Sequence, residues 1–378
     1  MIFNKFKAAT VQTSPVFLNA EKTIDKAITF IKEASENGAQ LIAFLPKYNL
    51  SKMEFSKFKA AAVQTSPVFL DADKTIDKAI LFIKEAASNG AELIAFPEVF
   101  VSGYPYWNWI MTPVQGSKWY EKLYKSAITT SGSEVKRICE AAKEFNIHIV
   151  IGINEQGSSF GEIYNTNLII DNKGILIGKH RKLVPTWAEK LTWTSGDGSS
   201  LKVYDTKIGP IGTLACGENT NTLARFTLLT QGELIHVANY ISLPVAPPDY
   251  DMAEAIKIRA AAHSFEGKLF TIVSCSTISQ EIKDALREDV PNVDELLTRK
   301  NSAFSGFIRP NGAVIGTPLI DEEGIVYADI DLEKCIQPKQ MHDILGHYNR
   351  FDIFDLRVNT APTRNITFID NHEAFNNK

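Results

Sequence analysis

The hydrophobic positions of the chain alternate between short runs typical of strands and longer segments with helical spacing. Apolar residues recur three and four positions apart over residues 133–145 and 252–266, which predicts amphipathic helices there. Nearly continuous apolar runs over 148–153, 234–238 and 270–274 predict buried strands. Because such strands and helices interleave along the chain, the pattern predicts an α/β fold in which helices cover sheets.

Three further pairs of apolar runs are separated by turn residues and predict β-hairpins. They are residues 164–170 with 175–179, 201–205 with 211–215, and 304–309 with 313–316. The second hairpin ends at Cys216, and a helix-like pattern follows over residues 222–229. The cysteine is therefore expected at a turn between a strand and a helix.

A long internal repeat occupies the amino-terminal part of the chain. Residues 5–44 recur at 57–96 with a constant offset of 52, and seven of the 40 aligned positions differ. Each copy has the pattern of a strand, an amphipathic helix ending at Asn-Gly, and a second strand, which predicts a βαβ-type unit. Two copies are too few for a solenoid, which needs at least three repeats.

Only the second copy leads into the rest of the protein, and this suggests the domain boundaries. We expect residues 1–55 to form a duplicated unit ending in a linker over 49–55. Residues 56–345 are expected to form one complete domain, and residues 346–378 a polar tail. Since the second copy fills the place that the first would need in a sheet, the first copy should pack peripherally, be poorly ordered or exchange with its twin.

Composition and charge exclude several classes of partner. Hydrophobic residues make up 44% of the chain and charged residues 22%, as in soluble globular proteins. The 40 basic and 44 acidic residues are mixed along the sequence, so neither a nucleic-acid footprint nor a basic membrane patch is visible. Without a signal-peptide core or a membrane-length apolar run, a cytoplasmic location is expected. The expected partners are a small molecule and further copies of this chain.

The four cysteines are scattered, which argues against a zinc site and a disulfide scaffold. Cys139, Cys275 and Cys335 have no acid-base pattern nearby and are interpreted as structural. Cys216 differs because N–H groups of the following turn and helix could point at its sulfur and favour the thiolate. On position alone, a buried structural thiol remains the commoner case.

Three residues with complementary chemistry follow predicted strands: Glu98, Lys182 and Cys216. Strand ends cluster at one edge of a sheet, where α/β proteins place their sites. A thiol can attack as nucleophile, a carboxylate can take its proton and activate water, and an ammonium can stabilise the developing negative charge. Taken singly, Glu98 and Lys182 could each be a solvated surface charge.

The segments around these residues resemble the signature segments of the nitrilase superfamily of carbon-nitrogen hydrolases. They are Phe96-Pro97-Glu98, His180-Arg181-Lys182 and Cys216-Gly217-Glu218-Asn219. Further stretches resemble its nitrilase branch, namely Gly103-Tyr104-Pro105, Pro185-Thr186, Asn221-Thr222-Leu223-Ala224-Arg225, Ala262-His263-Ser264-Phe265-Glu266-Gly267 and Gly346-His347-Tyr348. The resemblance runs from about residue 57 to beyond Tyr348.

The resemblance implies a four-layer α-β-β-α sandwich, assembly as a homo-oligomer, and a Glu-Lys-Cys triad supported by Glu189. Two residues depart from the family pattern. Gly217 stands where many members have Trp, and Phe351 stands where a Pro is usual. In the first repeat copy Pro46 takes the position of Glu98, so that copy supplies no catalytic carboxylate.

The implied activity is hydrolysis of an organic nitrile to the carboxylic acid and ammonia through covalent intermediates on Cys216, without a metal or organic cofactor. The alternatives are an amidase of the same superfamily, a cyanide-degrading enzyme and a non-catalytic, assembly-forming pseudoenzyme. Tyr104, Trp107 and Trp187 are candidates for lining the substrate pocket, with a core role as the alternative. His180, His236 and His263 are interpreted as structural histidines, with hydrogen bonding near the site as the alternative.

Overall fold

The computed structural model describes residues 7–10, 20–39, 41–43 and 55–363. The chain divides into two compact units, Met1–Glu54 and Phe55–Lys378. Several sequence predictions fall outside the described residues: the linker apart from Phe55, the position of Pro46, and residues 364–378 of the tail.

The first unit contains a strand, a helix and a second strand. Strand β1 (Ala8–Thr10) pairs in parallel with β2 (Leu41–Ala43), and helix α1 (Ala20–Glu36) lies between them in sequence. A parallel pair needs such a crossover connection. The apolar stripe of α1 is largely solvent-exposed, since Ile24 is 58% and Ile31 41% accessible.

The second unit contains two six-stranded mixed sheets. The first sheet has the order β14-β3-β4-β5-β6-β7, made of β14 (Gly324–Asp331), β3 (Lys57–Gln64), β4 (Ala91–Ala95), β5 (His148–Gln156), β6 (Ile163–Ile170) and β7 (Leu176–Arg181). The second has the order β13-β12-β11-β10-β9-β8, made of β13 (Val314–Ile320), β12 (Phe304–Ile308), β11 (Phe270–Cys275), β10 (Ile235–Tyr240), β9 (Gly209–Ala215) and β8 (Tyr204–Thr206).

Each sheet has three parallel strands at its centre and antiparallel strands outside them. In the first sheet β3, β4 and β5 are parallel, and in the second β9, β10 and β11 are parallel. The hairpins predicted from turn residues are the antiparallel pairs β6–β7, β8–β9 and β12–β13. Their prediction is confirmed, although β8 is shorter than the predicted run over 201–205.

The two sheets pack face to face around a core of aliphatic and aromatic side chains. Successive residues of a strand point to opposite faces, and β3 shows how both faces are used. Ala60 and Ala62 face the second sheet and pack in a cluster with Ile235 of β10. Ala61 and Val63 face outward, where the helices cover the sheet.

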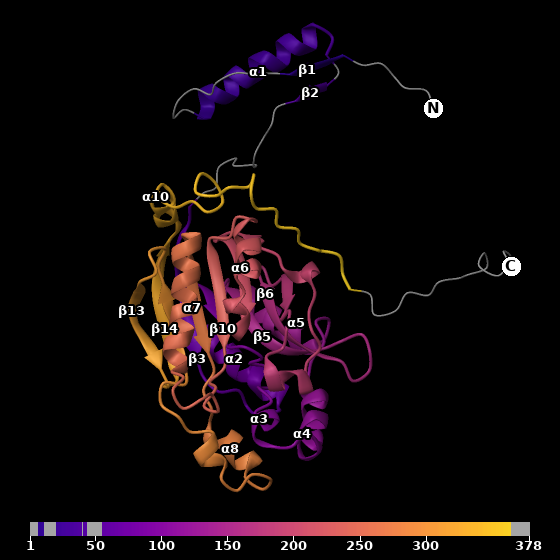
Figure 1. The fold of residues 1–378 in the computed structure, drawn as a ribbon, viewed down its shortest axis with the longest axis vertical. Coiled ribbons are helices and arrows are strands. Elements are labelled where there is room, and N and C mark those ends of the chain that lie inside the picture. The colour runs from indigo at the N-terminus through magenta and orange to yellow at the C-terminus, as the bar shows by residue number, and fades with distance from the viewer. Residues whose placement is uncertain (1–6, 11–19, 40, 44–54, 364–378) are drawn as a thin grey trace, which may run out of the picture. The chain divides into compact units, whose positions relative to one another are not determined.

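Helices cover the outer face of each sheet. On the first sheet lie α2 (Ala72–Ser88) and α5 (Ser133–Glu144). On the second lie α6 (Thr222–Leu229) and α7 (Met252–Gly267), and α7 runs alongside its strands (Figure 1). Ile76 and Ile83 of α2 are fully buried, and burying such a side chain contributes about 1.5–3 kcal/mol.

The remaining helices are short apart from α4 and lie in connections. They are α3 (Trp107–Ile110), α4 (Pro113–Ser126), α8 (Gln280–Leu286), α9 (Val293–Leu296) and α10 (Ile336–Lys339), with 3-10 helices at Trp187–Leu191, Gly198–Ser200, Cys216–Thr220 and Leu332–Cys335. None of the helices in the described part of the chain combines the length and the apolar character that crossing a membrane requires. The prediction of an α/β fold is confirmed.

Candidate active site

Glu98 lies in the segment that leaves the carboxyl end of β4. This segment passes close to the neighbouring strand β5 at Gly152, where a Cβ atom would lie 2.3 Å from the backbone nitrogen of Val99 and 2.5 Å from the carbonyl oxygen of Pro97. Only glycine permits so close an approach. The backbone N–H of Glu98 donates to the carbonyl of Tyr240, at the end of β10, over 3.3 Å. The segment therefore connects the ends of both sheets.

Lys182 lies directly after β7, and its ammonium group lies between two carboxylates. Nζ donates to Oε1 of Glu98 over 2.9 Å and to Oε2 of Glu189 over 2.7 Å. All three side chains are at most 2% exposed. Burial alone would lower the pKa of Lys182, but the charges of Glu189 and Glu98 outweigh it and hold that pKa well above its ordinary value. The lysine is therefore a permanent cation in a water-poor site.

The carboxylate of Glu98 has one occupied and one open oxygen. Oε1 accepts from Lys182 and from Nδ2 of Asn165 over 2.7 Å, whereas Oε2 has no hydrogen-bond partner among the described residues. Burial raises the pKa of Glu98, Lys182 lowers it and Glu189 raises it, with a net increase. A buried carboxylate with a raised pKa and a free oxygen is suited to accept a proton.

Glu189 is held by two further donors besides Lys182. Its Oε2 accepts from the backbone N–H of Thr186 over 2.7 Å, and its Oε1 accepts from the hydroxyl of Tyr104 over 2.9 Å. Tyr104 in turn accepts from Nε1 of Trp109 over 3.0 Å. Every oxygen of Glu189 is therefore satisfied, and the residue provides a fixed negative charge beside Lys182.

Cys216 begins the 3-10 helix Cys216–Thr220 at the end of β9, with a left-handed backbone conformation. Its φ of +49° is uncommon for a residue other than glycine and costs on the order of 1 kcal/mol or more. The side chain is buried in a cluster with Tyr240. Burial raises the pKa of the thiol, the charge of Glu98 raises it further, and Lys182 opposes this increase.

The thiolate expected at the turn is therefore disfavoured in the free protein. Helix α6 begins at Thr222, as the sequence predicted. Its N-cap is Asn221, whose side chain accepts from the N–H groups of Leu223 and Ala224. Those donors are used within the helix terminus, so burial determines the state of Cys216.

Glu218 ties the segment that carries Lys182 to the strand that carries Cys216. Its Oε1 accepts from the backbone N–H of Leu183 over 2.7 Å, and its Oε2 accepts from that of Ala215 over 3.0 Å. Nε2 of His180 lies 2.9 Å from the same Oε2. Burial would raise the pKa of Glu218, but His180 and the backbone donors lower it overall. The carboxylate thus stays charged and fixes the spacing of the two loops.

The arrangement combines a nucleophile, a base and a fixed cation. Glu98 and Lys182 are in direct contact, and the charges of both act on the thiol of Cys216. Such a set can perform nucleophilic attack on a polarised carbon, with proton transfer through the carboxylate and charge stabilisation by the ammonium.

Comparison with known proteins agrees with this chemistry. The family model described as carbon-nitrogen hydrolase matches residues 59–340. An aliphatic nitrilase of Rhodococcus rhodochrous is 36% identical over 310 residues, 81% of this chain and 84% of that protein. Nitrilase 3 of Arabidopsis thaliana is 36% identical over 324 residues, 83% of this chain and 90% of that protein. The chain belongs to the carbon-nitrogen hydrolase family.

Solved structures support the same fold for this carbon-nitrogen hydrolase. Nit3 of Saccharomyces cerevisiae, a member of branch 10 of the nitrilase superfamily, matches with a TM-score of 0.60 at 22% identity, over 76% of this chain and 95% of that chain. The NitFhit protein of Caenorhabditis elegans matches with a TM-score of 0.64 at 18% identity, over 83% of this chain and 70% of that chain. The family predicted from the signature segments is confirmed.

The three aromatic residues predicted to line the pocket occupy different environments. Tyr104 is buried and its hydroxyl contacts Glu189, as described above. Trp107 is buried in an aromatic cluster with Phe69 and Trp119. Trp187 is 73% exposed and packs against Trp109. The buried position of Trp107 fits the core role that was its alternative, and substrate contact by all three residues stays a prediction.

Several residues around this hydrolase site were not identified from the sequence. The side chain of Asn165 donates to Glu98, that of Glu218 accepts from the backbone N–H groups next to Lys182 and Cys216, and that of Asn219 donates to the carbonyl of Cys216. One signal was available, because Asn165 and Asn167 lie at alternate positions of a fully buried strand and so share one buried face. The three other cysteines lie as expected for structural residues, on α5 (Cys139), in β11 (Cys275) and buried in a 3-10 helix (Cys335).

Proposed function

We propose that this protein is a nitrilase that hydrolyses an organic nitrile to the carboxylic acid and ammonia. The observation that carries the proposal is the buried Glu98–Lys182–Glu189 network beside the thiol of Cys216. The choice of nitrile over other carbon-nitrogen substrates is supported by relatives named nitrilase at 36% identity over about four fifths of the chain.

In the first half of the reaction, the sulfur of Cys216 adds to the nitrile carbon while Oε2 of Glu98 takes the thiol proton. The carbon–sulfur bond forms as one carbon–nitrogen π bond breaks, and the proton goes on to the nitrogen to give a thioimidate. Lys182 and a backbone N–H after Cys216 stabilise the negative charge that develops on nitrogen. Since the thiol is protonated at rest, attack and proton removal are coupled.

In the second half, two water molecules complete the hydrolysis. Glu98 activates the first water, which adds to the thioimidate carbon, and ammonia leaves to give a thioester. The second water attacks the thioester and releases the carboxylic acid and the thiol of Cys216. Glu189 positions Lys182 throughout, through the bond of 2.7 Å between them.

The test is ammonia release from a panel of nitriles and their matching amides. We expect ammonia and acid from at least one nitrile, and none from any nitrile with Cys216→Ala. Ammonia from amides alone would identify an amidase, and formamide or formate from cyanide a cyanide-degrading enzyme. A folded, assembled protein inactive on all of these would support the pseudoenzyme alternative, and turnover retained by Cys216→Ala would refute the mechanism.

We further propose that residues 56–345 form the complete hydrolase domain, a four-layer α-β-β-α sandwich, and that residues 1–55 are a catalytically incomplete duplicate. The order of packing, helices, sheet, sheet and helices, supports the first statement. The match of the family model to 59–340 supports the second. Homo-oligomer formation is part of the proposal, and light scattering coupled to size-exclusion chromatography tests it.

A further inference from the structure

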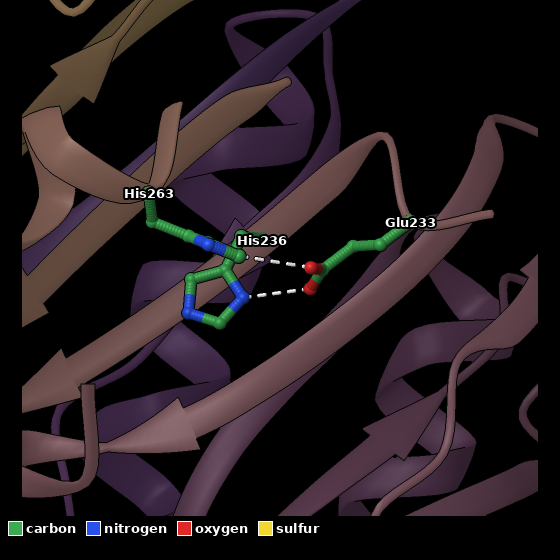
Figure 2. A group of neighbouring side chains, drawn as sticks. All are labelled: Glu233, His236 and His263. Atoms are coloured by element: carbon green, nitrogen blue, oxygen red, sulfur yellow. Dashed lines mark hydrogen bonds and ion pairs between the residues drawn. The ribbon is translucent and has the colours of Figure 1, made fainter. Parts of the chain in front are cut away.

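A buried cluster of one glutamate and two histidines lies beneath the cysteine turn. Glu233 precedes β10, His236 lies in β10, and His263 lies in α7. Oε1 of Glu233 lies 2.7 Å from Nδ1 of His236, and Oε2 lies 2.9 Å from Nε2 of His263 (Figure 2). All three side chains are at most 1% exposed, so bulk water satisfies none of them.

The cluster continues through Asn219 to the nucleophile. Nδ2 of Asn219 donates to the carbonyl oxygens of Leu214 and Cys216, each over 3.1 Å. Oδ1 of Asn219 lies 2.8 Å from Nε2 of His236. A continuous series of hydrogen bonds therefore runs from α7 through β10 to the two carbonyls that flank the start of the cysteine turn.

The hydrogen-bond roles determine the protonation of His236. Because Nδ2 of Asn219 donates to two carbonyls, the atom facing His236 is Oδ1, which only accepts, so Nε2 of His236 carries a proton. Nδ1 faces the carboxylate of Glu233, which also only accepts when ionised. Burial would raise the pKa of Glu233, but His236 and His263 lower it to about 2, which keeps it ionised. Both ring nitrogens of His236 therefore face acceptor atoms, Oδ1 of Asn219 and Oε1 of Glu233.

His263 completes the cluster as a neutral donor. Burial, together with the nearby charge of His236, lowers the pKa of His263 to about 4. Its Nε2–H donates to Glu233, and its Nδ1 has no partner among the described residues, as fits a lone pair rather than a buried N–H.

The geometry points to a positioning role: we propose that Glu233, His236 and His263 act through Asn219 to hold Cys216 in its strained conformation for attack. The left-handed φ of Cys216 costs free energy and persists only where the surroundings fix it. Glu218 fixes the N–H of Ala215, and Asn219 fixes the carbonyls of Leu214 and Cys216. This inference rests on the proposed function, in which Cys216 is the nucleophile.

The same three side chains have the donor set of a metal site, since one donor atom from each lies within 4.8 Å of the others. The hydrogen-bonded arrangement explains them without an ion, because the separations of 2.7 and 2.9 Å are those of charge-assisted hydrogen bonds. Metal analysis of the purified protein is therefore part of the test.

The experiment measures the rate at which iodoacetamide alkylates Cys216, followed by mass spectrometry of the peptide that carries it. Asn219→Ala and His236→Phe should lower the rate by about a hundredfold, as expected when a reacting atom moves by about 1 Å. Glu233→Ala should lower it in the same direction. Glu233→Gln should recover most of the loss, since the amide can donate to Nδ1 of His236 and accept from His263.

His148→Phe serves as the matched control, because His148 is equally buried but bonds the carbonyl of Glu92 instead. It should leave the alkylation rate close to that of wild type, and circular dichroism should show each variant folded. If His236→Phe fails to fold, the alkylation rates of Asn219→Ala, Glu233→Ala and Glu233→Gln still test the proposal. Wild-type alkylation rates in folded Asn219→Ala and Glu233→Ala would overturn the proposal, as would one equivalent of bound metal that the Glu233 variants lose.

Alkylation of Cys216 does not depend on which substrate the protein hydrolyses. The proposed function and the positioning role can therefore be refuted independently of each other. A wild-type protein that is alkylated at Cys216 but hydrolyses no nitrile would refute the proposed function alone. Nitrile hydrolysis that is unchanged in folded Asn219→Ala would refute the positioning role alone.

Discussion

Replacing Tyr104 with phenylalanine separates two roles for this residue. The sequence made Tyr104 a candidate for substrate contact with a core role as the alternative, and the structure places its hydroxyl 2.9 Å from Glu189 and 3.0 Å from Nε1 of Trp109. Tyr104→Phe removes that hydroxyl and leaves one oxygen of Glu189 and the indole N–H of Trp109 without these partners. Because Glu189 accepts a hydrogen bond from Lys182, the loss should reach the ammonium group that we propose stabilises the transition state.

The expected size of the loss follows from the charge on Glu189, which accepts the hydrogen bond from Tyr104. A hydrogen bond to a charged group contributes about 1.5–3 kcal/mol, and one between neutral groups about 0.5–1.5 kcal/mol. If the loss appears in the transition state, kcat/KM should fall by about tenfold to a hundredfold, since about 1.4 kcal/mol corresponds to a factor of ten. The fall should be the same for every nitrile that the enzyme accepts, because Glu189 acts on Lys182 and not on the substrate side chain.

The assay is kcat/KM for Tyr104→Phe over a series of nitriles of increasing size. Tyr106→Phe is the matched control, since Tyr106 is equally buried, contacts the ring of Tyr104 and donates to the neutral carbonyl of Ser242 over 2.9 Å. The control should lose less activity than Tyr104→Phe. A loss in Tyr104→Phe that varies with the size of the nitrile would refute the role assigned from the structure and restore the substrate contact.

Three further predictions test the site and the domain boundary. Glu98→Gln should abolish nitrile turnover while shifting the alkylation profile of Cys216 to lower pH, because the charge of Glu98 raises the pKa of the thiol; an unshifted profile would contradict the coupling. The pKa of His263 is lowered from 6.5 to about 4 by burial, so its contribution of about 3 kcal/mol to stability is fully present above pH 6.5 and lost as the pH falls through 4. His263→Gln should therefore flatten the fall of the melting temperature between pH 6.5 and 4, and an equally steep fall would argue against it. Deleting residues 1–54 should leave activity and melting temperature unchanged, since the family model begins at residue 59.

The sequence could propose Glu98, Lys182 and Cys216 as reactive residues because each follows a recognisable strand. Glu98, Lys182 and Cys216 were placed at strand ends by hydrophobic pattern, and chemistry suggested their grouping. Their supporting contacts were not predictable in this way. The bond from Tyr104 to Glu189 joins residues 85 positions apart, and no local pattern indicates such a pairing.

The protonation state of the Cys216 thiol shows a second limit of prediction from the sequence. Predicting a thiolate at Cys216 required that N–H groups of the turn and of the following helix favour it, whereas burial raises the pKa of the thiol and Asn221 accepts from the N–H groups of Leu223 and Ala224. The helix begins at Thr222, as predicted, so the error lies in the balance between burial and the N–H groups and not in the element. Electrostatic predictions from sequence are therefore weaker than the assignment of the elements that carry the charges.

The internal repeat shows how far local sequence determines structure within one chain. Both copies form a helix at equivalent positions, α1 and α2, because the amphipathic pattern is shared. Yet Ile24 and Ile31 of α1 are 58% and 41% exposed, while their counterparts Ile76 and Ile83 are fully buried against the sheet and α5.

Helices α1 and α2 differ in what packs against their isoleucines and not in the isoleucines themselves. At about 1.5–3 kcal/mol for each fully buried side chain, the second copy gains several kcal/mol that the first lacks, although the isoleucines are identical. An apolar stripe in a sequence therefore identifies the face that needs a partner, and the rest of the chain decides which copy obtains one.

By the same reasoning, a variant of the second copy with Ile76→Ala and Ile83→Ala should destabilise the hydrolase domain, whereas Ile24→Ala and Ile31→Ala should leave its melting temperature unchanged. Equal losses from both pairs would mean that the first copy also contributes to the packed core.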